Sequence, residues 1–517
     1  MIHMEESNQK VKKQRQQTNM RSIINFLQGV AFTLFIFAII LSIYLISIYS
    51  ARLKPLDTYA IVFDAGSSHT EMFVYYWPAD KSDGLGTTST VNEYFVCPLI
   101  SIIINDTTKP GELIKLKAIS DFEQHLEYLD DYFQPCLTKA ISKIPSNRHK
   151  FSPIFLGATA GMRLARLRNV TKSLQVLETI REIFSNSPFQ FVVARQVRIL
   201  TGIEEAIDGW ITTNILLENF KHRHSKKKQL EHSSSQIEFD SDMVGVLDLG
   251  GASTQVTFTY KNDNNTEQVP DEFTTNITLF DTVYSPYAHS YLCWGKNEAL
   301  RRYRARLLNA ALDTKRLHLP NLKYISIADP CLARGANDTL TVNSLFRSPC
   351  MVKPKESTTE RYKLRDFPQD IIAKRLVNVC ETSYELLYKQ ESMTPQNEQH
   401  KRGLCFDAWY MWLLLTYAIG FKQNDLQRLS FANTFPTGKV GWTLGYMINQ
   451  TNYIPAEFRE QKINRSNFIS WFSSSLAIAI ITLIFLLLTC YICCRKRSTI
   501  VSRSKDGYIK PIEQANV

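Results

Sequence analysis

Two long stretches of the chain contain no charged residue, one near each end. The first runs from Ser22 to Ala51 and the second from Ser466 to Cys494. Each is long enough to cross a bilayer as a helix, which takes about 20 residues. A buried core helix is the alternative, but uncharged runs of this length are typical of membrane spans. We therefore predict transmembrane helices at 23–49 and 468–494.

Between these stretches, short apolar runs alternate with segments of helical periodicity, which favours an α/β fold. Two pairs of apolar runs predict hairpins around the short turns "AGSS" at 65–68 and "GGAS" at 250–253. Helical spacing predicts a helix over 121–144, another opening at Ala160, and a loop followed by a helix over 199–220. The polar segment that follows has no periodicity and predicts an exposed loop.

The two hairpins predict two lobes between the membrane spans. We expect the first lobe over 52–240 and the second over 241–465, each built on one hairpin. The acids at the two turns, Asp64 and Asp248, lie 184 residues apart, about the length of one lobe. Sequence identity between the lobes is too low to define a repeat from the residues alone.

The charges flanking the spans predict the orientation. The tail 1–22 carries a net charge of +3 and the tail 495–517 a net charge of +4, so both tails are expected in the cytoplasm and 52–465 outside or in a lumen. A signal peptide is the alternative for the first span, but its apolar stretch is longer than a signal core and no clean cleavage site follows, which favours an uncleaved anchor. The charge left over gives no reason to propose nucleic acid as a partner.

Glycosylation sequons and cysteines agree with an oxidising compartment. The cysteines of the region between the spans lack metal-ligand spacing, so disulfides are expected, with one thiol left over. Cys490, Cys493 and Cys494, at the end of the second span, are either palmitoylation sites or inert. The predicted glycosylation sites are Asn105, Asn169, Asn264, Asn276, Asn337 and Asn449, and a further sequon, Asn464, is close to the membrane.

Both turns have the composition of a phosphate site. Glycines let backbone N–H groups approach an anion, and the neighbouring hydroxyls add donors. An aspartate at the strand end, Asp64 or Asp248, can hold a divalent cation through its water ligands. Two ordinary hairpins are the simpler interpretation of either turn alone. The recurrence of the same Asp-x-Gly pattern favours a pair of turns that grip a polyphosphate.

These turns resemble the phosphate loops of the actin, hexokinase and heat-shock-chaperone ATPases, which implies a two-lobed α/β fold with ribonuclease-H-like lobes. More narrowly, "FDAGSSHT", "FLGATAGMR", "GIEEAIDGW", "DLGGASTQ" and "GWTLGYM" match in order the five conserved regions of the ecto-nucleoside triphosphate diphosphohydrolases, or ecto-apyrases. "HSYLCWGKNEALRR" and the two anchors resemble the plasma-membrane branch of that family. The resemblance spans nearly all of residues 58–460.

The resemblance implies catalytic roles for two residues. Glu205 matches the glutamate that acts as general base, although Ala206 stands where the family usually has glycine. Without the motif, Glu204 and Glu205 would read as acids that stabilise a helix start, and we leave Glu204 as structural. Ser253 matches the serine that orients the attacking water with the glutamate.

The remaining site residues follow from the same match. Asp64 and Asp248 are implied around a Ca²⁺ or Mg²⁺ ion, mainly through its water, with Thr159 and Gln255 near the metal and water. Arg163 supports the phosphate loop or pairs with a carboxylate, and His69 could be a turn residue only. The residues expected to bind phosphate or nucleotide are Gly66, Ser67, Ser68, His69, Thr70, Gly250, Gly251, Ala252, Ser253, Thr254 and Gln255.

One segment departs from the family pattern. Between Cys350 and Cys380 the family has a longer stretch that supplies one wall of the nucleobase pocket, so base recognition by this chain is in doubt. Matching family positions imply the disulfides Cys97–Cys136, Cys293–Cys350 and Cys380–Cys405. Cys331 is then left without the partner expected in the shortened segment.

The leading hypothesis is a plasma-membrane apyrase that cleaves extracellular nucleoside tri- and diphosphates, with both termini cytoplasmic. A Golgi lumenal nucleoside diphosphatase and a nucleotide-binding ectodomain with reduced catalysis are the alternatives. A sugar kinase of the same superfamily would need a cytosolic site, which the sequons and the topology oppose. A homo-oligomer could form through the transmembrane helices, and the sequence leaves the oligomeric state open.

Overall fold

The fold is that of a computed structural model, which describes residues 2–50, 56–81, 88–105, 113–192, 194–220, 243–260, 270–315, 326–351, 371–389, 395–457 and 465–503. Residues Asp57–Ala456 form one compact unit, and the two terminal helices form another. The predicted loop over 221–241 and most of the shortened segment before Cys380 lie outside the described residues.

The first sheet contains the first hairpin. Its strand order is β3-β2-β1-β6-β7, in which β1 pairs antiparallel with β2 and parallel with β6. This mixed order requires a crossover after the hairpin, as expected for α/β topology. The strands are β1 (Asp57–Ala65), β2 (Thr70–Pro78), β3 (Asn92–Pro98), β6 (Ile154–Ala158) and β7 (Val197–Ile199).

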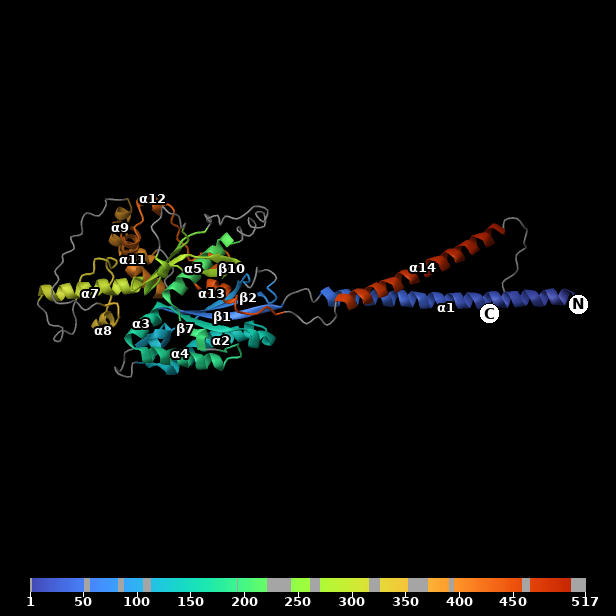
Figure 1. The fold of residues 1–517 in the computed structure, drawn as a ribbon, viewed down its shortest axis with the longest axis horizontal. Helices are drawn as coiled ribbons and strands as arrows, with labels where there is room; N and C mark the ends of the chain where they lie inside the picture. Colours follow the sequence, from blue (N-terminus) through green and yellow to red (C-terminus); the bar gives the residue numbers. More distant parts are fainter. Residues whose placement is uncertain are drawn as a thin grey trace. The chain divides into compact units, whose positions relative to one another are not determined.

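Both faces of the first sheet are buried, which explains the continuous apolar runs in its strands. On one face, Phe63 of β1 packs against Phe133 of α2 and Phe184 of α4, with ring centroids 5.1 and 5.2 Å apart. Figure 1 shows these helices along one side of the sheet and α5 and α13 on the other. The helices are α2 (Leu129–Lys143), α3 (Ala160–Arg168), α4 (Val170–Ser185), α5 (Gly202–Leu216) and α13 (Thr443–Gln450).

The helix predicted over 121–144 begins later than expected. Residues Ile119–Gln124 and Leu126–Tyr128 form 3₁₀-helical turns, and α2 starts at Leu129. The Asp121 carboxylate accepts hydrogen bonds from the backbone N–H groups of Lys117 and Ala118, at 2.9 and 3.0 Å. This local cap favours a tight turn over a continuing α-helix.

The second sheet contains the second hairpin and has the order β12-β9-β8, all antiparallel. Helix α5 packs against all three of its strands, although it follows the first sheet in the chain. Helix α13 contacts helix α5 and also strands β1 and β2 of the first sheet. The elements are β8 (Val246–Leu249), β9 (Ser253–Phe258), β12 (Tyr287–Leu292) and α7 (Lys296–Lys315).

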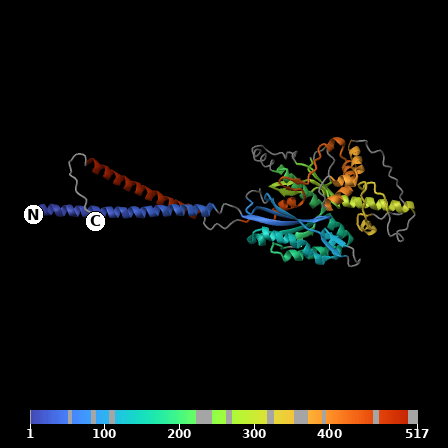
Figure 2. The same ribbon diagram turned by 180° about the vertical axis from the view of Figure 1, so that it is seen from behind.

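Two sheets that each hold one Asp-Gly hairpin, with helices between them, confirm the predicted α/β class. The lobe boundary at 240/241 stays a prediction, because α5 and α13 each pack against the sheet of the other half. Figure 2 shows the same fold from behind. The smaller elements are β4 (Ile102–Asn105), β5 (Leu113–Leu116), β10 (Ile277–Leu279), β11 (Thr282–Tyr284), β13 (Thr434–Phe435), β14 (Gly438–Lys439), α8 (Val342–Phe346), α9 (Ile371–Glu381), α10 (Tyr384–Lys389), α11 (Pro395–Leu413) and α12 (Gln423–Leu426).

The terminal helices α1 (Ile2–Ser50) and α14 (Arg465–Arg503) pack side by side and antiparallel. Tyr49 stacks on Phe468 with ring centroids 4.1 Å apart, and the Ser475 hydroxyl donates to the Ala38 carbonyl at 2.8 Å. Small and hydroxyl side chains at the contact are typical of helices that associate in lipid. By length and composition both helices can cross a membrane, which fits a two-span protein.

Candidate active site

The two predicted turns lie against each other. The first joins Ala65 of β1 to Thr70 of β2, and the second joins Leu249 of β8 to β9. A Cβ added at Gly251 would lie 2.5 Å from the Ser67 hydroxyl oxygen, which places the second turn against the first. The sequence pattern thus does bring two Asp-Gly turns together.

A helix begins beside each turn. A Cβ at Gly161 of α3 would lie 2.8 Å from Ser67 Cα, which places the start of α3 against the first turn. The Lys296 and Asn297 N–H groups of α7 donate to the Gly250 and Gly251 carbonyls at 2.9 and 2.8 Å. Helix N-termini carry partial positive charge, so both turns lie in a potential that favours anions.

Asp64, at the end of β1, has a buried carboxylate oxygen and a raised pKa. Its Oδ1 atom is buried and has no hydrogen-bond partner among the described residues. The pKa of Asp64 is raised to about 7, mainly by desolvation, with smaller contributions from the carboxylates of Glu71 and Asp248. The Trp442 indole faces Asp64 and lowers the pKa, but its N–H also lacks a partner of ordinary hydrogen-bond geometry.

Asp248 occupies the corresponding position on β8. Its side chain reaches solvent. Desolvation by the surrounding protein raises the pKa of Asp248, and water at its exposed side screens the charge. The Asp248 charge contributes to the raised pKa of Asp64, and a bound divalent cation would relieve this effect.

Arg163 of α3 joins the two predicted catalytic residues. Its Nη2 atom lies 2.7 Å from Glu205 Oε2 and donates to Ser253 Oγ at 3.0 Å. The interpretation that Arg163 pairs with a carboxylate is confirmed. Gln255 Nε2 also donates to Ser253 Oγ, at 2.7 Å. Glu205, Ser253 and Gln255 are all buried.

The Glu205 carboxyl has a strongly perturbed pKa. The net pKa is raised to about 7: desolvation is the largest cause, Arg163 opposes it, and Asp248 and Asp64 add to it. Burial therefore outweighs the ion pair. A buried carboxyl that titrates near neutral pH beside a charged partner is a candidate general base.

Glu204 has a structural role, in contrast to the adjacent Glu205. Its carboxylate accepts from the Thr201 N–H and the Arg198 guanidinium at 2.8 and 2.9 Å, while the Thr201 hydroxyl accepts from the Glu204 N–H. This reciprocal pair is a capping box that begins α5. Glu204 thus positions the helix that presents Glu205.

Some of the residues that we expected to bind phosphate are buried or form hydrogen bonds within the protein. Thr70 is fully buried, and the Thr254 hydroxyl donates to the Trp294 carbonyl at 2.7 Å. Ser68 and His69 are exposed, and the Ser68 hydroxyl lies 3.1 Å from His69 Nδ1. Thr159, at the start of α3, is buried beside Ala65, whose carbonyl accepts from the Thr159 N–H at 3.1 Å.

Sequence reasoning gave no role to Trp442, Ser290 or Asn297. Trp442 lies against Gly157, where a Cβ would be 2.3 Å from the indole, and Gly157 pairs with Asp64 in the sheet. Gln255 Nε2 donates to the Ser290 hydroxyl at 3.2 Å. Trp442 and Ser290 lie within quoted motifs, but their contacts join segments far apart in the chain, so no local pattern could assign them.

The three implied disulfides, Cys97–Cys136, Cys293–Cys350 and Cys380–Cys405, are confirmed. Cys331 is a thiol, with a pKa raised by desolvation. Of the predicted glycosylation sites, Asn105, Asn169, Asn276 and Asn337 are exposed, and Asn449 is half-buried on α13. Asn264 and Asn464 lie outside the described residues.

Comparison with known proteins defines the class. A model of the GDA1/CD39 (nucleoside phosphatase) family matches residues 52–357 and 353–466. Ectonucleoside triphosphate diphosphohydrolase 8 of Gallus gallus is 30% identical over 88% of this chain and 95% of its own length. Ectonucleoside triphosphate diphosphohydrolase 3 of Homo sapiens is 30% identical over 89% of this chain and 91% of its own.

The fold, the paired turns and these matches define a hydrolase that removes phosphate from nucleotides. The chain belongs to the GDA1/CD39 (nucleoside phosphatase) family. The predicted resemblance and the predicted enzyme class, a nucleoside triphosphate diphosphohydrolase, are confirmed. The chain also aligns with a crystal structure of nucleoside triphosphate hydrolases from Neospora caninum over 57% of this chain and 53% of that chain, with a TM-score of 0.35 and 15% identity.

Proposed function

We propose that the chain removes terminal phosphates from extracellular nucleoside tri- and diphosphates such as ATP and ADP, by attack of a water molecule. One observation carries this proposal: a single guanidinium, Arg163, holds both Glu205 and Ser253 beside two facing phosphate turns. Backbone N–H groups and hydroxyls of 66–69 and 250–252 would bind the phosphate oxygens.

Glu205 is the proposed general base. Such a group is most effective when its pKa lies near the working pH, and the pKa of Glu205 is raised to about 7. The opposing effects of burial and Arg163 on this pKa leave a carboxylate that can accept the proton of the attacking water. The hydrogen bonds of Arg163 fix the carboxylate relative to Ser253.

Ser253 is proposed to orient the water rather than to attack. Its oxygen accepts hydrogen bonds from both Arg163 and Gln255. Two donors withdraw electron density from the hydroxyl oxygen and make it a poor nucleophile. The remaining O–H bond can donate to the water or to a phosphate oxygen.

The residues fit a divalent cation, Ca²⁺ or Mg²⁺. Asp64 and Asp248 supply the oxygen ligands that these ions prefer, and the buried Asp64 Oδ1 lacks a protein partner in the described part of the chain. Within the described residues no three acidic, histidine or cysteine side chains form a direct metal cluster, so water would complete the ligands. The bound cation would neutralise charge on the phosphate oxygens.

We propose that the catalytic region faces the cell exterior. Two apolar helices with basic tails and exposed sequons support this location. The homologues carry the word ectonucleoside in their names, which is consistent with the same side of the membrane.

The direct test is phosphate release by intact expressing cells that are supplied with ATP, ADP or UDP. We expect release that stops on adding a chelator and returns with excess Ca²⁺ or Mg²⁺. Cells expressing the Asp64→Asn variant at equal surface amounts serve as the control. Undiminished release in excess chelator contradicts the metal-assisted mechanism, and no release from any nucleotide contradicts the function.

A further inference from the structure

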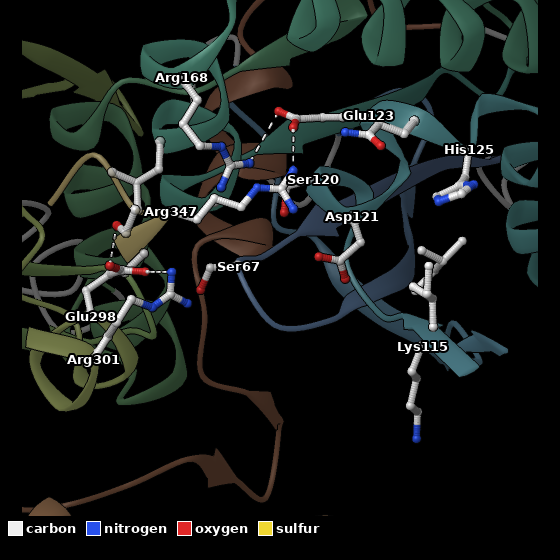
Figure 3. Close-up of a pocket in the computed structure, with 17 residues that line it drawn as sticks. Ser67, Lys115, Ser120, Asp121, Glu123, His125, Arg168, Glu298, Arg301 and Arg347 are labelled. Atoms are coloured by element: carbon white, nitrogen blue, oxygen red, sulfur yellow. Dashed lines mark hydrogen bonds and ion pairs between the residues drawn. The ribbon is translucent and has the colours of Figure 1, made fainter. Parts of the chain in front are cut away.

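A polar pocket of about 290 Å³ adjoins the two turns. It shares Ser67, Gly161 and Ala252 with them, but its lining includes none of Asp64, Glu205 and Asp248. Figure 3 shows its basic side chains. The pocket is therefore next to the proposed catalytic centre and distinct from it.

One buried carboxylate in this pocket binds two arginines. Glu123, with a side chain only 5% exposed, lies 3.3 Å from Arg168 Nη2 and 3.7 Å from Arg347 Nη2. A charged group so deeply buried requires this compensation. Two guanidinium groups against one carboxylate leave a local excess of positive charge.

The other acids of the pocket are also compensated. Glu298 accepts from the Ser348 hydroxyl at 2.5 Å and lies 3.5 Å from Arg301. Asp121 accepts from two backbone N–H groups. In Figure 3 the guanidinium groups of Arg301 and Arg347 extend into the space between Glu298 and Glu123.

Arg347 is the cation best placed to bind a ligand. Its side chain is 53% exposed, and its contact with Glu123 is the longer of the two. The Cys293–Cys350 disulfide ties its segment to the second turn, where the Cys293 N–H donates to the Ala252 carbonyl at 2.8 Å. Glu123 and Arg168 come from the half of the chain that holds the first turn, so the pocket is built from both halves.

We propose that this pocket is a second anion site that takes inorganic phosphate, the product of the proposed hydrolysis. The identity of the ligand as product rests on the proposed function, while the anion site rests on the arginines. A volume of about 290 Å³ lies at the lower end of the range of ligand pockets, about 300–1,000 Å³, and holds a phosphate ion together with bound water. Arginine binds tetrahedral oxyanions through paired N–H groups, and the guanidinium groups of this pocket supply them.

The proposal makes opposite predictions for two substitutions. Arg347→Gln removes a charge-assisted contact and should weaken phosphate binding by about tenfold or more. Glu123→Gln keeps the shape but frees both arginines from their carboxylate, so phosphate should bind more tightly. If the cluster only held the structure together, both changes would leave phosphate binding unaltered.

The test measures binding of radiolabelled inorganic phosphate to the full-length protein in detergent, at constant ionic strength, with and without a non-hydrolysable ATP analogue. We expect a site that the analogue does not displace, weakened by Arg347→Gln and strengthened by Glu123→Gln. Arg166→Gln, on the exposed side of α3, is the matched control and should have no effect.

Phosphate binding that the analogue displaces completely overturns the proposal, as does binding that is equal in the Arg347→Gln variant and the wild type. Thermal unfolding of each variant without phosphate shows whether it is folded, and Arg301→Gln replaces Arg347→Gln if the latter is not. Hydrolysis is not part of the measurement. A protein that binds phosphate here but releases none from nucleotides therefore contradicts the proposed function alone.

Discussion

At the scale of single residues, Arg163 affects both the pKa of Glu205 and the position of its carboxylate. Its positive charge lowers the pKa of Glu205, which weakens a base, while burial and the neighbouring acids raise that pKa. Its hydrogen bonds also fix Glu205 and Ser253 in one geometry. The arginine thus favours the ionised form of the base and fixes its orientation.

Removing this charge should move the pH dependence of turnover. In the wild type, turnover rises with pH through about 7 as Glu205 loses its proton. In Arg163→Gln the pKa of Glu205 rises, because its nearest cation is gone, so the midpoint should move upward by about one pH unit or more. The measurement is kcat against pH at saturating cation, with Arg166→Gln as control. An unchanged midpoint contradicts the assignment of Glu205 as the titrating base.

At the scale of elements, the contact between α5 and α13 joins the two halves of the site. A Cβ at Gly445 would lie 1.9 Å from the Asp208 carbonyl oxygen, and the Gly445 N–H donates to the Thr212 hydroxyl at 2.8 Å. Both partners belong to α5, which also carries Glu205. The helix that presents the base is therefore held by a backbone contact that only glycine allows.

Gly445→Ala should separate these helices. Because the clash is with backbone, it cannot be relieved by a rotamer change, and we expect a loss of about 1–3 kcal/mol in the free energy of unfolding. Gly441→Ala is the matched control, since a Cβ there meets no atom within 4 Å. Denaturant unfolding of both variants measures the difference. Equal stability of the two would mean that the helices do not approach as described.

The elements also show how much of this structure could be predicted. Both hairpins and α5 follow from local apolar patterns and turn glycines, and Glu205 and Ser253 from ordered motifs. The late start of α2 could not be predicted, because it depends on the Asp121 side chain, which caps the preceding turn. The contact of α13 with α5 joins residues 233 positions apart, and no local pattern encodes such a pairing.

At the scale of the whole molecule, the account depends on which side of the membrane holds the site. Both tails should be cytoplasmic and the exposed sequons should carry glycans, because basic flanks stay inside. Glycosidase should lower the apparent mass, and protease added to intact cells should spare tags on both tails. Wild type treated after permeabilisation is the control. A tail tag cleaved on intact cells contradicts the topology.

The central claim is that Glu205 activates the attacking water, and the most direct measurement compares phosphate release by Glu205→Gln and Glu204→Gln at equal surface amounts. Glutamine at 205 keeps the shape but cannot accept the proton, so turnover should fall at least about a hundredfold with nucleotide binding kept. Glutamine at 204 can still accept from Thr201 and cap α5, so it should cost far less. An active Glu205→Gln variant contradicts the account.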